Sequence, residues 1–280
     1  MKANDPQPSA GPQPLPAWTA RLRVKIAWPV LAAGGALAEF LRRGWRPEIC
    51  FETEDLVRTS AEAYAPVAHA LAEAGLVPTF HAPFMYIDPG SDLPDQRREA
   101  EVALELTAEA ARHLRPEVVV CHGGGLYRVP LDERRRWSRV ARPLFRDLAA
   151  RLASECGARL VLENVVDSDP EPLAELLADL APQDVGWCYD VGHQHLFDRH
   201  GAPHWIATLG PFLRHMHLHD NHGRQDDHLP PGQGRIDFAT LFQHLAPYPE
   251  PSATLEVPWR DGVPQSLATL GPVWPWGGRG

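Results

Sequence analysis

The stretch Arg214–Phe238 (RHMHLHDNHGRQDDHLPPGQGRIDF) concentrates side chains that bind divalent metal ions. Its histidines and aspartates are His215, His217, His219, Asp220, His222, Asp226, Asp227, His228 and Asp237. The alternation of apolar and histidine residues over Leu213–His219 is typical of a buried strand, and the residues that follow indicate a loop. Imidazoles and carboxylates at a strand end are ligands that borderline divalent ions prefer, so this stretch predicts part of a metal site. Taken alone, it also fits a solvated polar loop with surface histidines.

The same residue types recur where the other predicted strands end. They are His81, His122, Glu163, Asp190, His193 and Glu256. Strands of a parallel barrel open on one face at their C-terminal ends, so these groups are expected to meet His217, Asp226 and His228 there. Carboxylates held together raise one another's pKa, and divalent cations remove that repulsion. Nine candidate ligands are too many for one tetrahedral ion, and they favour two or three ions.

Short apolar runs alternate with longer helical patterns about eight times along the chain. The predicted strands are Leu22–Val30, Pro47–Glu52, Leu76–His81, Glu117–His122, Ala158–Asn164, Val185–Asp190, Leu213–His219 and Ala253–Pro258. This alternation predicts an α/β fold, a (β/α)8 TIM barrel in a single domain over residues 21–280. A doubly wound open sheet is the alternative, but no glycine fingerprint follows the first strand. Residues 1–20 are rich in proline and are expected to form a disordered tail.

Composition excludes several classes of function. The 280 residues carry 27 Lys+Arg against 36 Asp+Glu, a net charge of −9, which does not favour binding to nucleic acid or to a membrane surface. No apolar run is long enough to span a membrane. The four cysteines lack CxxC spacing, and three lie in apolar runs, so we expect reduced core residues in a cytoplasmic protein.

Seven short motifs give the chain a family resemblance. They are HAPF at His81, CHGGG at His122, LEN at Glu163, DVGH at Asp190–His193, MHLHDN at Met216–Asn221, DDHLPPGQG at Asp226–Gly234 and LEVP at Leu255–Pro258. On these motifs the sequence resembles the xylose isomerase-like TIM-barrel superfamily, also called the AP endonuclease 2 superfamily, over about residues 20–260. The resemblance extends to members described as sugar phosphate isomerases or epimerases.

The resemblance to the endonuclease IV branch implies up to three metal positions. They would be held by His81, His122 and Glu163, by Glu163, Asp190, His217 and Glu256, and by His193, Asp226 and His228. A water bridging the first two metals would then attack phosphorus. The loop after His81 reads MYIDPGSD, unlike the DNA-inserting loop of the endonucleases, and no basic track is evident. DNA is therefore the less favoured substrate, and we expect a small phosphorylated or sugar-like molecule.

Two reactions fit these residues. The first hypothesis is a hydrolase of phosphoesters or phosphodiesters with a two- or three-metal site of zinc, manganese or iron, because a one-metal isomerase has no need of His81 and His122. The alternative is a sugar or sugar-phosphate isomerase or epimerase that uses one divalent metal. In that scheme Glu163 and Glu256 are catalytic and move a proton between substrate carbons. A non-catalytic barrel with a vestigial metal site is a third, less favoured reading.

Substrate contacts are expected from residues near the ligands. Trp259 and Arg260 follow Glu256 closely, and they could supply a stacking face and an anion contact. His193, in the loop after the sixth strand, is a further candidate. Packing at the barrel rim would explain Trp259 and Arg260 equally well. The sequence does not identify the oligomeric state.

Overall fold

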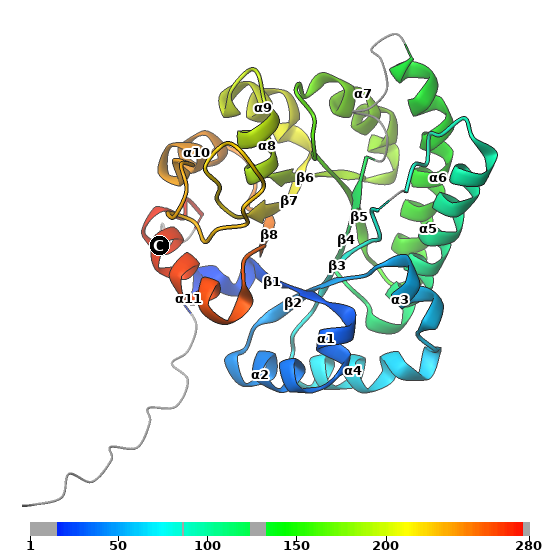
Figure 1. Ribbon diagram of the computed structural model, residues 1–280, viewed down its shortest axis with the longest axis horizontal. Coiled ribbons are helices and arrows are strands. Elements are labelled where there is room, and N and C mark those ends of the chain that lie inside the picture. The colour runs from blue at the N-terminus through cyan, green and yellow to red at the C-terminus, as the bar shows by residue number, and fades with distance from the viewer. Residues whose placement is uncertain (1–15, 86, 124–132, 277–280) are drawn as a thin grey trace, which may run out of the picture.

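Eight parallel strands close into a barrel in the computed structural model, which describes residues 16–85, 87–123 and 133–276 (Figure 1). The strands are β1 (Leu22–Ala27), β2 (Arg46–Cys50), β3 (Thr79–His81), β4 (Val118–His122), β5 (Arg159–Glu163), β6 (Gly186–Asp190), β7 (Leu213–Leu218) and β8 (Ser252–Leu255). They are hydrogen-bonded in chain order, and β1 pairs with β8 to close the ring. The predicted (β/α)8 barrel is confirmed.

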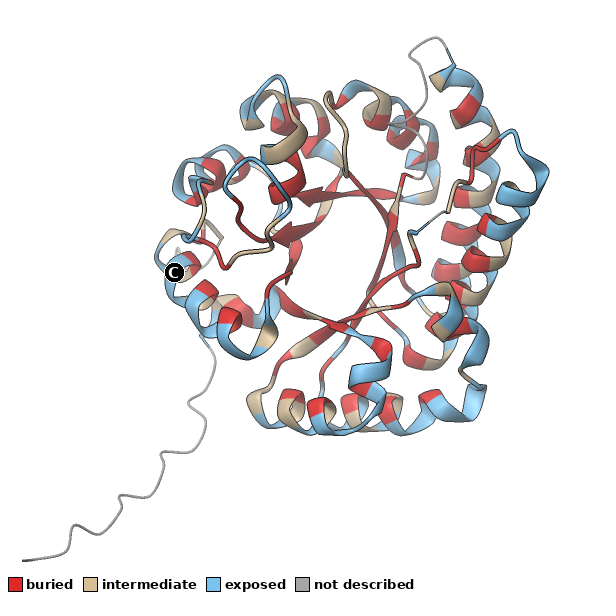
Figure 2. Cartoon of the chain, viewed as in Figure 1, coloured by how far each residue is buried: buried red, intermediate tan, exposed pale blue. Residues whose placement is uncertain are grey.

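Helices surround the barrel and cover its outer face (Figure 1). They are α1 (Trp28–Ala32), α2 (Gly35–Arg43), α3 (Thr53–Arg58), α4 (Ala61–Glu73), α5 (Pro94–Leu114), α6 (Arg134–Glu155), α7 (Glu171–Leu180), α8 (Val191–Phe197), α9 (Ala202–Leu209), α10 (Phe238–Leu245) and α11 (Trp259–Leu270). Figure 2 shows the strands buried, whereas each long helix has a buried side against the sheet and an exposed side. Burial of these apolar faces is the main force that assembles the ring.

Several segments differ from the sequence-based expectation: the third strand begins at Thr79 and not at Leu76, and the eighth ends at Leu255 and not at Pro258. Proline explains the change in the first strand. The first strand was expected to reach Val30, but it ends at Ala27. Pro29 lies in the first turn of α1, where its missing amide hydrogen costs nothing, so the helix begins at Trp28. The expected tail was also too long, because a 3-10 helix covers Ala17–Arg21. Residues 1–15 lie outside the described part of the chain.

Strand register brings the predicted ligands to one level of the barrel. His122 of β4 is paired with Glu163 of β5, and Asp190 of β6 is paired with His217 of β7. All four residues lie at or near the C-terminal ends of their strands. Because the strands run parallel, their side chains gather at the same mouth.

The interior holds the cysteines as free thiols. Cys121 and Cys188 are buried, and Cys50 and Cys156 are partly buried. These free thiols agree with the expectation of reduced cysteines.

No helix in the described residues is long and apolar enough to cross a membrane.

Candidate active site

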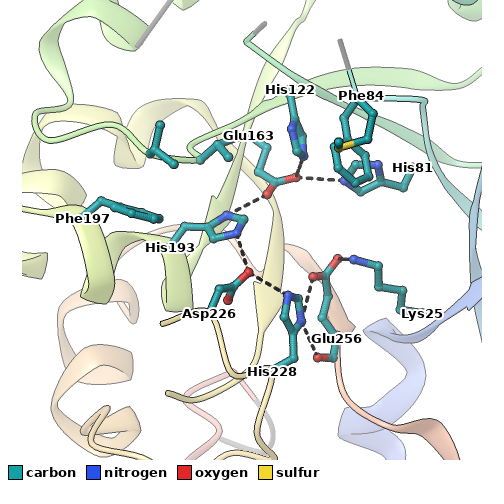
Figure 3. Close-up of a pocket in the computed structure, with 13 residues that line it drawn as sticks. Lys25, His81, Phe84, His122, Glu163, His193, Phe197, Asp226, His228 and Glu256 are labelled. Atoms are coloured by element: carbon teal, nitrogen blue, oxygen red, sulfur yellow. Dashed lines mark hydrogen bonds and ion pairs between the residues drawn. The ribbon is translucent and has the colours of Figure 1, made fainter. Parts of the chain in front are cut away.

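A cavity of about 320 Å³ opens at the C-terminal mouth of the barrel (Figure 3). Its polar lining consists of Lys25, His81, His122, Glu163, His193, Asp226, His228 and Glu256. Its apolar lining consists of Phe84, Met85, Val165, Val166 and Phe197. The two remaining predicted ligands, Asp190 and His217, are fully buried and contact lining residues. The structure therefore brings all nine predicted ligands together.

Glu163 lies at the centre of the upper cluster, where three imidazoles surround its carboxylate (Figure 3). Its Oε2 is 3.2 Å from His81 Nε2 and 3.3 Å from His122 Nε2. Its Oε1 is 3.1 Å from His193 Nδ1. Burial alone would raise the pKa of Glu163, but His122 and His217 hold that pKa well below its usual range. The carboxylate is thus kept ionised, as a metal ligand must be.

His217 presents a buried nitrogen to three carboxylates. Its Nδ1 lies 3.4 Å from a Glu163 oxygen, 3.6 Å from an Asp190 oxygen and 3.3 Å from a Glu256 oxygen. Nδ1 has no hydrogen-bond partner among the described residues, although it is inaccessible to water. One unpartnered imidazole nitrogen on which three carboxylates converge is a donor set that fits a divalent cation.

A second cluster lies beside the first one and begins at the start of α8. Asp190 caps this helix by accepting a 2.7 Å hydrogen bond from the His193 backbone N–H. The ring of His193 extends across to Asp226, with Nε2 3.3 Å from Oδ2. His228 Nε2 is 2.9 Å from the same oxygen. His193 was expected in a loop after the sixth strand, whereas it lies in the first turn of α8, and this helix fixes the direction in which its ring points.

Glu48 of β2 is a buried carboxylate that the sequence analysis did not identify. Its Oε1 lies 3.1 Å from His217 Nε2, the ring nitrogen that faces away from the three carboxylates. Its Oε2 accepts hydrogen bonds from the hydroxyls of Thr79 and Thr254, at 2.9 and 2.7 Å. A carboxylate behind a ligating histidine fixes the ring orientation and raises its basicity. The one signal in the sequence was a glutamate in the middle of a buried strand.

We expect Glu48→Gln to weaken divalent metal binding by about 10- to 100-fold, because the histidine loses its charged partner. The affinity for Mn²⁺, measured by calorimetric titration of metal-free protein, checks this result. Glu117→Gln is the matched control, since Glu117 forms its ion pair with Arg23 near the N-terminal ends of the strands. Equal Mn²⁺ affinity in the Glu48 variant and the control would show that Glu48 does not support the site.

Lys25 is the second residue that the sequence analysis missed. It comes from β1, lines the cavity, and places its Nζ 2.8 Å from Glu256 Oε1. Burial would raise the pKa of Glu256, but the Lys25 ammonium and His217 together lower that pKa to about 2. The sequence holds only two lysines, Lys2 and Lys25, among its 27 basic residues. A compact ammonium at the cavity wall is therefore an exception in a chain that otherwise uses arginine.

Trp259 and Arg260 are placed apart from the other predicted site residues. Neither belongs to the described lining of the cavity. The Trp259 ring packs against Phe40 at a centroid distance of 5.6 Å, and the Arg260 guanidinium lies 4.4 Å from the Trp259 ring centroid. These contacts are those of rim packing, and a role for the two residues in substrate binding stays a prediction. His193, the third expected substrate contact, does line the cavity.

Comparison with known proteins gives one family match. The profile of a family described as "Xylose isomerase-like TIM barrel" matches residues 33–272. An uncharacterized protein of Methanocaldococcus jannaschii is 29% identical over 181 residues, which are 59% of this chain and 58% of that protein. An uncharacterized protein of Sinorhizobium fredii is 34% identical over 111 residues, 37% of this chain and 35% of that protein. These matches thus cover less than two thirds of either curated relative.

Solved structures share the fold over nearly the whole chain. A protein of Thermus thermophilus, soaked with ZnCl₂, is 25% identical with a TM-score of 0.74, covering 90% of this chain and 97% of its own. A D-tagatose 3-epimerase-like protein is 22% identical with a TM-score of 0.73, covering 90% and 98%. A D-psicose 3-epimerase of Clostridium cellulolyticum, with D-tagatose, is 16% identical with a TM-score of 0.67, covering 90% and 99%.

Proposed function

Because this chain belongs to the xylose isomerase-like TIM barrel family, we propose that it is a metal-dependent isomerase or epimerase of a small sugar or sugar derivative. This proposal reverses the order of the two hypotheses drawn from the sequence, in which hydrolysis came first. The similar structures named for 3-epimerases support the change. The observation that carries the proposal is the pair Glu163 and Glu256 in one small cavity.

The two glutamates are arranged for proton transfer at carbon. Both carboxylates line the cavity, and each lies within 3.4 Å of His217 Nδ1. Both are buried, and their pKa values are held below the usual range, so each is a base at neutral pH. In the proposed reaction one glutamate removes the proton on the carbon beside the substrate carbonyl and becomes a carboxylic acid. The other glutamate takes up a proton from solvent and delivers it to that carbon, and the first glutamate then releases its proton to solvent.

A divalent cation fits between these groups, on the donors that converge at His217. Glu163, Asp190, His217 and Glu256 would hold it. When bound, such a cation supplies the Lewis acidity that polarises a substrate carbonyl and acidifies the neighbouring C–H bond. Phe84 and Phe197 line the cavity and give it an apolar wall.

The size and lining of the cavity support a class of substrate. Its volume of about 320 Å³ is at the lower end of small-molecule sites, which span about 300–1,000 Å³. Lys25 is the one lysine or arginine among the described lining residues, and its ammonium can donate to a substrate oxygen. We propose a substrate of roughly the size of one sugar unit, with an oxygen that gains negative charge during the reaction.

We expect Lys25→Met to lower kcat/KM about 10- to 100-fold, while the metal content of the protein stays the same. The ammonium would stabilise charge that develops on substrate, and losing one such donor typically costs this much or more. Lys25→Arg is the matched variant, because it keeps the positive charge but replaces the compact ammonium with a larger, planar guanidinium. Turnover of the methionine variant equal to that of wild type would show that Lys25 serves only as a partner for Glu256.

Solvent exchange tests the proposed function. Protein loaded with Mn²⁺ is incubated in D₂O with D-tagatose, D-psicose, D-fructose and their phosphates, and the loss of each C–H signal is followed by NMR. Deuterium incorporated beside the carbonyl, together with a new epimer or isomer, is the expected result. No exchange with any of these sugars, combined with phosphate or nitrophenol release from nitrophenyl phosphate esters, would overturn it.

Phosphoester hydrolysis is the second candidate, and one observation favours it. His81 and His122 both approach the same oxygen of Glu163, and the three ligand atoms lie close enough to hold a cation of their own. Two cations sharing Glu163 could clamp the oxygens of a phosphoryl group. The nitrophenyl esters in the exchange experiment are included for this reason.

A further inference from the structure

His219 is a buried histidine that neither reaction scheme uses. It follows β7 directly and is fully buried. One ring nitrogen, Nε2, lies 3.1 and 3.3 Å from the two carboxylate oxygens of Asp190. The other nitrogen, Nδ1, is shielded from water and has no hydrogen-bond partner among the described residues. It faces Asp226, whose Oδ1 is 3.6 Å away.

The partner of Nε2 determines what Nδ1 can do. An ionised carboxylate only accepts hydrogen bonds, so in the neutral imidazole the hydrogen facing Asp190 is assigned to Nε2. Nδ1 is then left with a lone pair that faces an oxygen of a second carboxylate. Two acceptors that face each other repel unless a cation lies between them, and the buried Nδ1 has no water to satisfy it.

We propose that His219 is a metal ligand, through Nδ1, at a cation position that it shares with Asp226 and His228. The ligand atoms of these three residues lie within 4.8 Å of one another. Bonds of about 2.0–2.2 Å to nitrogen and oxygen let a cation join atoms up to about 4 Å apart, which the 3.6 Å between Nδ1 and Asp226 Oδ1 satisfies. This inference rests on the metal centre of the proposed function, and it is independent of the reaction catalysed.

Neighbouring residues pack against both sides of this ring and fix its position. A Cβ added to Gly192 would lie 2.0 Å from His219 Cε1, so only glycine leaves space for the imidazole there. On the other side, His219 stacks on His228 with centroids 4.2 Å apart and an angle of 11° between the planes. The ligand nitrogens of the two rings therefore lie close to each other. Packing from both sides would preorganise a ligand and limit the rearrangement that metal binding requires.

His219 also connects two parts of the centre. Asp190 is one of the donors around His217, and His219 holds it through Nε2. The same ring would bind the second cation through Nδ1. His219 would therefore be a ligand of one cation and a positioning residue for the other. A substitution that keeps a polar group at Nε2 and removes Nδ1 can therefore test the two roles separately.

The test measures Zn²⁺ binding to metal-free protein, by calorimetry and by elemental analysis after desalting. His219→Gln places an amide near the Nε2 position and removes Nδ1. We expect this variant to lose the second equivalent of Zn²⁺, or to bind it at least about tenfold more weakly, while the first equivalent is retained. His204→Gln is the matched control, because His204 is an exposed histidine paired with Glu171.

Zn²⁺-loaded wild-type crystals give a second readout that does not depend on a variant folding. Anomalous scattering should place an ion within bonding distance of His219 Nδ1, Asp226 and His228. Two equivalents in wild type and unchanged affinity in His219→Gln would overturn the inference. One equivalent in wild type would overturn it as well, yet would leave the one-metal isomerase proposal intact. Two ions, no sugar exchange and release of nitrophenol from the phosphate esters would instead overturn the proposed function.

Discussion

Replacing Glu163 with glutamine is expected to reduce exchange of the substrate's carbon-bound proton by about 10³-fold or more. A positioned general base typically contributes about 10²–10⁴-fold to such a reaction, and Glu163 is also a proposed metal ligand. Glutamine has nearly the same shape, so the barrel should remain folded. The loss should therefore be seen in the rate and not in the expression or thermal unfolding of the protein.

The measurement is NMR exchange in D₂O with the sugar that wild type turns over best. Glu171→Gln is the matched control, since Glu171 lies on the exposed surface of α7 and should not affect the rate. The metal content of each variant is determined in parallel, so that loss of the base is separated from loss of the cation. A Glu163→Gln variant that keeps exchanging at the wild-type rate would remove Glu163 from the mechanism.

Removing divalent cations is expected to abolish turnover and to lower the thermal unfolding midpoint by about 10 °C. A cation present at about 1,000 times its Kd stabilises the folded state by about 4 kcal/mol, and for a chain of this size each kcal/mol shifts Tm by about 2–4 °C. The stabilisation arises because Glu163, Asp190 and Glu256 are buried carboxylates that converge on His217. Without a cation their repulsion is relieved only by nearby imidazoles and Lys25.

Scanning calorimetry of chelated protein, before and after Mn²⁺ is restored, measures this shift. His217→Ala provides the comparison, because it removes the nitrogen on which the three carboxylates converge and should remove most of the Mn²⁺-dependent rise in Tm. If chelated and Mn²⁺-loaded wild type unfold at the same temperature, the carboxylates are not holding a cation.

The sequence predicted the barrel and its ligands because both follow from position along the chain. Strand–helix alternation defines a parallel barrel, and parallel strands bring residues at their ends, such as His122 and Glu163, to one mouth. The HLHDNHGRQDDH stretch added residues from one strand and the loop after it. These relations need no knowledge of side-chain packing, and the structure places all nine candidate ligands together.

The sequence did not reveal Lys25 and Glu48, which lie within β1 and β2. Strands of a buried barrel are apolar on both faces, so periodicity does not show which side chains point inward. Trp259 shows a second limit of reasoning from sequence. Its closeness to Glu256 in sequence suggested the cavity, but the first turn of α11 directs the ring toward Phe40. Helix direction, and not sequence separation, decided where the ring packs.

Reaction class was the part that the ligand types alone could not determine. The same imidazoles and carboxylates serve a hydrolase with several cations and an isomerase with one. His81 and His122 favoured the first interpretation from sequence, whereas the cavity supports the second. The pair Glu163 and Glu256 in a cavity sized for one sugar unit is the physical reason for preferring proton transfer.

Metal content per chain tests the central claim most directly. Wild-type protein is exposed to Mn²⁺ or Zn²⁺ and desalted, and its bound metal is counted by elemental mass spectrometry. The account predicts at least one tightly held equivalent, on the donors around His217, and a second that depends on His219. Folded protein that retains no divalent metal under these conditions would contradict the account, because the donors around His217 would then not form a cation site.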